Sequence, residues 1–141
     1  MKPTLQPGLE AHARFDVDRE RTIDFMGEAA RVYATPMLVR DIEIACRDLL
    51  LAHLDPGEDS VGTRVEIDHI GATLLGMPVH ITVRIAEVGG RAVVFEVEGR
   101  DSVEPIVHGR HARFVVDVAK TAQRLAAKAE KARLAQAPGG A

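Results

Sequence analysis

A long helix is predicted by residues 35–57, which read TPMLVRDIEIACRDLLLAHLDPG. We expect it to run from 36 to about 54, because Thr35 is a residue type that caps helices and Pro36 suits the first helical position. The Asp-Pro-Gly at 55–57 then ends it. Its apolar side chains form two neighbouring stripes: Leu38, Ile42, Ala45, Leu49 and Ala52, beside Val39, Cys46, Leu50 and Leu54. This surface is wide for a helix with water behind it, so we expect a curved sheet or a partner subunit to cover it on several sides.

Strands are predicted on both sides of this helix by the alternation of apolar and polar residues. One strand is expected at 11–18, and four more at 61–70, 79–88, 92–98 and 106–116. The segment EVGGR at 87–91 predicts a hairpin turn, and Gly109 a bulge or bend. Residues 22–34 predict a short irregular or helical piece, and residues 118–136 a second helix that lies against the body or stands in water. This order predicts an α+β fold with an antiparallel curved sheet wrapped around one long helix, the arrangement called a hot-dog fold.

Length and composition narrow the class of protein. A chain of 141 residues predicts one domain, 1–141, with its core at about 9–118 and a C-terminal helix at about 118–136. The net charge of −3 argues against a nucleic-acid partner, and the single cysteine, Cys46, excludes an internal disulfide and a cysteine-based zinc site. The apolar runs are far shorter than the ~20 residues that span a bilayer, and residues 1–10 do not resemble a signal peptide. We therefore expect a cytoplasmic protein without a membrane partner.

Glu43 is the charged residue that departs most from its helical surroundings. Val39, Cys46 and Leu50 are its neighbours at helical spacing. An unpaired carboxylate among apolar side chains would be desolvated, which favours its protonated form and suits proton transfer. The alternative is that Glu43 is solvated, as most helical glutamates are. The remaining charged residues of the helix predict an ordinary exposed face: Arg40, Asp41, Arg47 and Asp48.

His69 and Thr35 are the other two candidate site residues. His69 continues the inward alternation of Val65 and Ile67, and the alternative to a reactive imidazole is a buried histidine bonded to a backbone carbonyl. His108 and His111 have opposite alternation, so only one of them faces the core. Thr35 is either a structural helix cap or part of a substrate site. The second interpretation rests on the free N–H groups at a helix start, which can bind an oxyanion. Because Thr35 lies two turns from Glu43, about 12 Å along the axis, a bridging imidazole or water is needed to connect them.

Several short motifs occur in a fixed order along the chain. They are AT at 34–35, EIAC at 43–46, LDPGE at 54–58, GT at 62–63, HIGAT at 69–73 with Gly76, and GRHAR at 109–113. This series resembles the fluoroacetyl-CoA thioesterase-like family of hot-dog acyl-CoA thioesterases. The resemblance runs from about residue 33 to residue 116, which is most of the chain.

The resemblance implies hydrolysis of an acyl-CoA thioester to the free acid and CoA, with no cofactor and no metal. It implies a catalytic trio of Thr35, Glu43 and His69, with Gly62 and Arg113 in contact with substrate. Glu43 would act as general base or nucleophile, His69 would orient it or exchange protons with it, and Thr35 would hold the substrate or the attacking water. For Arg113 the alternative is a solvated charge on a strand. The family also implies a homodimer or a dimer of dimers.

One departure from the family concerns substrate choice. Its fluoroacetyl-selective members carry a pair of phenylalanines as a lid before the catalytic threonine, and the positions in register here are Met26 and Ala29. Phe25 and Tyr33 lie nearby but out of register. A short or medium acyl-CoA is therefore the expected substrate class. The alternatives are a non-catalytic acyl-CoA-binding hot-dog module and a hot-dog enzyme of the enoyl-CoA hydratase or dehydratase type.

Overall fold

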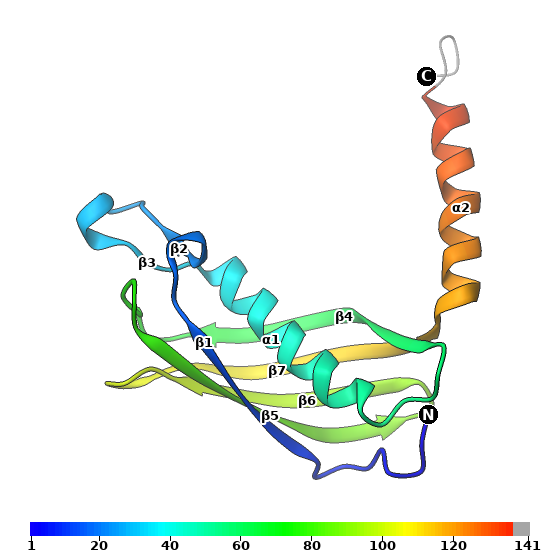
Figure 1. The fold of residues 1–141 in the computed structure, drawn as a ribbon, viewed down its shortest axis with the longest axis horizontal. Coiled ribbons are helices and arrows are strands. Elements are labelled where there is room, and N and C mark those ends of the chain that lie inside the picture. Colours follow the sequence, from blue (N-terminus) through cyan, green and yellow to red (C-terminus); the bar gives the residue numbers. More distant parts are fainter. Residues whose placement is uncertain (137–141) are drawn as a thin grey trace.

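The computed structural model describes residues 1–136 and has one long helix lying across an antiparallel sheet (Figure 1). The helix is α1 (Thr35–Leu51). The sheet has five strands in the spatial order β1-β5-β6-β7-β4. Their bounds are β1 (Glu10–Asp16), β4 (Glu58–His69), β5 (Pro78–Gly89), β6 (Ala92–Arg100) and β7 (Pro105–Asp117). The predicted α+β arrangement, a curved sheet around one helix, is confirmed.

The core lies between α1 and the face of the sheet that the helix covers. On the helix Leu38, Ile42 and Leu50 are fully buried, as the predicted stripes require. The sheet contributes alternate residues of its central strands, among them Val79, Ile81, Val83, Ile85, Val93, Phe95, Val97 and Val115. Aliphatic side chains dominate this core, in agreement with the low aromatic content.

The ends of α1 differ from the prediction. The capping residue is Ala34, and Thr35 is the first helical residue rather than the cap, which leaves its hydroxyl available to another partner. The helix ends at Leu51 instead of continuing to 54. Its last turn tightens there, with the N–H of His53 donating to the Leu50 carbonyl and the N–H of Leu54 to the Leu51 carbonyl.

The segment before α1 folds back over the start of the helix and buries one of its charges. It contains η1 (Arg19–Arg21), β2 (Thr22–Ile23), η2 (Glu28–Ala30) and β3 (Val32–Tyr33), where β2 and β3 form a small antiparallel pair. Asp41, which was predicted to be exposed, is 0% exposed, so that prediction is wrong. It accepts hydrogen bonds from the Tyr33 hydroxyl and from Arg21 Nε at 2.9 Å, and these partners compensate for its burial.

Strand β4 forms an edge of the sheet and carries one of its bulges. Its pairing with β7 shifts register between Gly62 and Arg64. No register shift occurs at Gly109, where a bulge was considered; that glycine lets the two backbones approach closely instead, since a Cβ there would overlap the Glu66 carbonyl oxygen. The hairpin between β5 and β6 turns at Gly90, whose φ of 61° favours glycine.

Helix α2 (Val118–Ala135) extends away from the sheet (Figure 1). It has no buried residue, which decides between the two expectations for this helix in favour of a helix in water. Asp117 caps its start by accepting from the Lys120 N–H at 3.0 Å.

Candidate active site

Thr35 and His69 meet at the start of α1. Thr35 is the first residue of the helix and His69 the last residue of β4, and Thr35 Oγ1 lies 2.7 Å from His69 Nδ1. The other imidazole nitrogen, Nε2, is buried and has no hydrogen-bond partner among residues 1–136. Such atoms are rare in folded proteins, so this nitrogen is free to serve a group from outside this chain's fold. Burial lowers the pKa of His69, opposed by the nearby backbone of Gly71, so the neutral imidazole is the main form at pH 7.

The Thr35–His69 pair opens into a pocket of about 470 Å³. Its walls are mostly apolar and come from the segment before α1 and from the residues after β4: Ile23, Phe25, Val32, Tyr33, Ala34, Pro36, Ile70, Gly71 and Ala72. The Tyr33 ring stands edge-on to the His69 ring, with 6.4 Å between centroids. The pocket thus combines apolar walls with one hydroxyl–imidazole pair, which suits a small apolar group next to a reacting polar centre.

The helix start offers fewer free donors than predicted. Pro36 has no N–H, and the N–H groups of Met37 and Leu38 both donate to the Ala34 carbonyl. An oxyanion held there would therefore depend on side chains more than on the usual cluster of free backbone donors.

Glu43 lies further along α1 and faces a different set of residues. Its Oε1 is 3.5 Å from Arg113 Nη1 and 3.9 Å from His111 Nε2, both on β7. Its side chain is 41% exposed, so the expectation of a desolvated carboxylate among apolar side chains is wrong for this chain. The reason is that β7 brings Arg113 and His111 to this side of the helix, so Glu43 faces polar side chains and solvent.

Arg113 and Gly62 adjoin Glu43 from paired positions on β7 and β4. Arg113 is 5% exposed, so the alternative of a solvated strand charge is wrong. Its Nε donates to Ser60 Oγ at 2.7 Å and its Nη2 to the Ser60 carbonyl at 2.9 Å. At Gly62 an added Cβ would overlap the Glu43 carboxylate where it now lies, so a larger residue would require that side chain to move.

The predicted residues therefore form two clusters. Thr35 and His69 make one, and Glu43 with Gly62 and Arg113 makes the other; no hydrogen bond or ion pair joins Glu43 to Thr35 or His69 within residues 1–136. Ser60 and His111 also belong to the second cluster and are not among the predicted site residues. The alternation along β7, which sends His111 inward beside Arg113, is the signal that could have found His111; Ser60 lies on β4 and carries no such signal.

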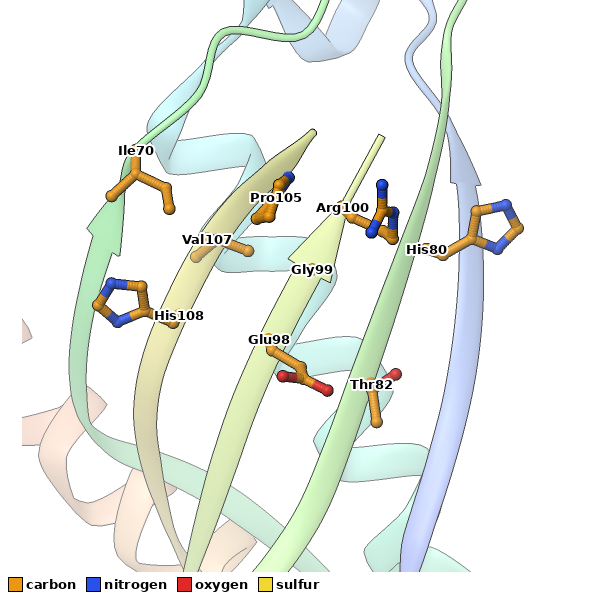
Figure 2. A pocket seen from close by; sticks show the side chains of 9 residues that line it. All are labelled: Ile70, His80, Thr82, Glu98, Gly99, Arg100, Pro105, Val107 and His108. Carbon is orange, nitrogen blue, oxygen red and sulfur yellow. The ribbon is translucent and has the colours of Figure 1, made fainter. Parts of the chain in front are cut away.

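A further pocket of about 390 Å³ lies on the sheet face turned away from α1. Figure 2 shows the residues that line it, which come from β5, β6 and β7 and, for Ile70, from the chain just after β4: Ile70, His80, Thr82, Glu98, Gly99, Arg100, Pro105, Val107 and His108. None of the predicted catalytic residues lines it. His108 is exposed on this face while His111 is buried on the other, as their opposite alternation predicts.

Residues 1–136 contain neither a membrane-spanning helix nor a cluster of metal-binding side chains. No helix within residues 1–136 combines the length and apolar character needed to cross a membrane. No group of three or more His, Cys, Asp or Glu side chains in the same range is arranged to hold a metal ion.

Known proteins share both the sequence and the fold of this chain. The family model described as fluoroacetyl-CoA-specific thioesterase matches residues 17–119. A fluoroacetyl-CoA thioesterase of Streptantibioticus cattleyicolor is 36% identical over 93 residues, 66% of this chain and 67% of that protein. A crystal structure of a mutant fluoroacetyl-CoA-specific thioesterase superposes with a TM-score of 0.83 at 30% identity, covering 90% of this chain and 99% of the other. The crystal structure of a hypothetical protein of Thermus thermophilus, a thioesterase superfamily member, superposes with a TM-score of 0.84 at 30% identity. The superposition covers 92% of this chain and 96% of the other.

The fold and these matches define a hot-dog thioesterase, a thioester hydrolase. They confirm the predicted fold and the predicted class of acyl-CoA thioesterase. More specifically, the chain belongs to the fluoroacetyl-CoA-specific thioesterase family.

Proposed function

We propose that this enzyme hydrolyses short or medium acyl-CoA thioesters, with Thr35, Glu43 and His69 as catalytic residues and Gly62 and Arg113 in contact with substrate. The observation that carries this proposal is the Thr35–His69 pair at 2.7 Å, at the mouth of an apolar pocket and with His69 Nε2 unpartnered. A hydroxyl hydrogen-bonded to an imidazole whose second nitrogen awaits a partner is the arrangement from which acyl-transfer sites are built.

In the proposed reaction Glu43 acts as general base. It takes a proton from water, whose oxygen attacks the thioester carbonyl carbon. The carbon–sulfur bond of the tetrahedral intermediate then breaks, and the proton passes through His69 to the CoA sulfur, giving the acid and the free thiol. Thr35 fixes the imidazole through Nδ1 and holds the attacking water beside the carbonyl.

The substrate class is tested by a panel of acyl-CoA thioesters from two to about twelve carbons, with CoA release followed by a thiol reagent. We expect the highest kcat/KM for a short or medium chain, since the pocket has a volume of about 470 Å³. Binding without thiol release would support the non-catalytic module instead, and equal kcat/KM along the whole panel would contradict the assigned chain length.

Phe25 should influence how tightly the acyl group binds. It lines the pocket although its side chain is 85% exposed, while Met26, in the lid register of the family, does not line it. We expect Phe25→Ala to raise KM for the best substrate about fivefold with little change in kcat, since it removes apolar contact made equally in ground and transition states. Met26→Ala is the matched control and should leave KM within twofold; equal effects of the two substitutions would contradict a specific role for Phe25.

We also propose that the enzyme works as a homodimer or dimer of dimers in which two chains pair along β4. This edge strand presents the half-exposed Val61 and Val65, and exposed apolar edges are normally covered. Antiparallel pairing of two β4 strands sets the carboxyl end of one, with His69, beside the amino-terminal half of the other, with Gly62. Each active site then combines Thr35 and His69 of one chain with Glu43 of its partner.

Shared sites predict complementation between inactive variants. Glu43→Gln and His69→Ala chains, unfolded together and refolded as a mixture, should regain about a quarter of the wild-type activity, because half of the dimers are mixed and each mixed dimer has one intact site. Each variant refolded alone is the control. A mixture no more active than its parts, or a monomeric mass by light scattering, would contradict the shared site.

A cytoplasmic location is part of the proposal. The buried Cys46 is a free thiol, as is common in a reducing compartment. Fractionation of the native host with an antibody to the chain tests it, and recovery in the membrane or exported fraction would contradict it.

A further inference from the structure

The Arg113 guanidinium is held by three hydrogen bonds in addition to its contact with Glu43. Two go to Ser60, and the third joins Arg113 Nη1 to His111 Nε2 at 3.1 Å. Arg113 and His111 are both almost completely buried, and Glu43 Oε1 lies on the same side of the guanidinium as His111 Nε2. Three bonds from a planar group fix its orientation, so the direction in which Arg113 meets Glu43 is set by its neighbours.

The hydrogen bonds of His111 define which of its nitrogens carries the proton. Its Nδ1 lies 2.8 Å from the Arg64 carbonyl oxygen, which can only accept, so Nδ1 must carry a hydrogen. Its Nε2 faces the Arg113 guanidinium, which can only donate, so Nε2 must present a lone pair. His111 is therefore neutral, with its proton on Nδ1.

The bulge of β4 supplies the acceptor for this tautomer. The register between β4 and β7 shifts between Gly62 and Arg64, directly before the carbonyl that His111 uses. Bulges commonly redirect a backbone group next to an active site. The ring of His111 also stacks against Phe95, at 6.4 Å between centroids with an interplanar angle of 26°.

We propose that His111 is a positioning residue: as the neutral Nδ1–H tautomer it orients Arg113, and Arg113 in turn holds the Glu43 carboxylate in its working place. The reaction role of this network rests on the proposed function of Glu43. The tautomer itself does not, because it follows from hydrogen bonds within one chain.

The surroundings of His111 determine in which direction its pKa is shifted. Burial lowers its pKa and the charge of Arg113 lowers it further, opposed by the Arg64 carbonyl and the Glu43 carboxylate. The imidazole therefore stays neutral at pH 7. As the pH falls through the lowered pKa, protonation at Nε2 sets two donors against each other and breaks the bond between His111 and Arg113, which leaves Arg113 with its two bonds to Ser60.

The tautomer can be measured without turnover. Long-range proton–nitrogen NMR spectra of the ¹⁵N-labelled protein at pH 7.5 report which imidazole nitrogen is protonated, and the His111→Gln variant identifies the His111 signals by their loss. We expect a protonated Nδ1 and an unprotonated Nε2. An Nε2–H tautomer or a doubly protonated ring would overturn the proposal, whereas the expected tautomer in a protein without thioesterase activity would contradict only the proposed function.

A double-mutant cycle tests the positioning role. We expect His111→Gln to lower kcat about tenfold with KM changed less than threefold, and Arg113→Lys to lower kcat at least as much. Because the two residues act in series, the double variant should be no slower than Arg113→Lys alone. A double variant whose loss of kcat equals the product of the two single losses would overturn the proposal.

Ser60→Ala is a second variant, for the case that His111→Gln does not fold. It removes one bond to Arg113 and keeps the backbone one. We expect Ser60→Ala to lower kcat threefold to tenfold in the wild-type protein and to have no further effect in the Arg113→Lys variant. An equal loss of kcat in both proteins would show that Ser60 does not act through Arg113 and would contradict the proposal.

Discussion

Replacing Glu43 with glutamine should lower kcat for acyl-CoA hydrolysis by a factor on the order of 10³, with KM within threefold of wild type. Glutamine keeps the size of the side chain but cannot take a proton from water. Its neighbours Arg113 and Gly62 stay in place, so folding and binding should be preserved. Steady-state kinetics by thiol release, with the thermal midpoint as a check on folding, measure this effect.

Asp48→Asn is the matched control for Glu43→Gln. Asp48 is a carboxylate on the same helix but exposed to solvent, so its replacement should leave kcat within twofold of wild type. A Glu43→Gln enzyme with more than a third of the wild-type kcat would show that the carboxylate is not the base.

Gly109→Ala should lower the free energy of unfolding by about 3 kcal/mol or more. A Cβ at this position would overlap the Glu66 carbonyl oxygen and lie 2.7 Å from the Ile67 Cα, and backbone atoms cannot rotate away as a side chain can. Strand β4 would have to separate from β7, which also displaces Gly62 and His69. Urea denaturation followed by circular dichroism measures the change.

Gly89→Ala is the control for this substitution. Gly89 lies at the end of β5, in a conformation open to other residues, and a Cβ there meets no atom within 4 Å. Its unfolding free energy should stay within about 0.5 kcal/mol of wild type. Equal effects at the two glycines would contradict a close approach of β4 to β7 at Gly109.

The fold was predictable because its determinants are local and periodic. The wide apolar face of α1 and the alternation in β5, β6 and β7 each depend on residues near one another in the sequence, and each is found as expected. Asp41 was not predictable in the same way. Its burial depends on Arg21 and Tyr33, which reach it only after residues 19–33 fold back over the helix.

The site was predictable in part. The inward alternation of His69 and the position of Thr35 at the start of the helix are local features, although Thr35 is the first helical residue rather than the cap. The surroundings of Glu43 depend on which side chains β7 brings to the helix, and helical spacing alone predicted apolar neighbours in place of Arg113 and His111. The charges beside a helix face depend on residues of a strand that packs there, and the spacing of residues along the helix contains no information about them.

The central claim is that Thr35, His69 and Glu43 together hydrolyse a thioester, and its most direct test compares four proteins on one substrate. Release of CoA from a short acyl-CoA is followed with a thiol reagent for the wild type and for Thr35→Ala, Glu43→Gln and His69→Ala. We predict saturable release by the wild type and at least a hundredfold lower kcat for each variant. Release that persists unchanged in all three variants, or a wild-type protein that binds the acyl-CoA without releasing any thiol, would contradict this claim.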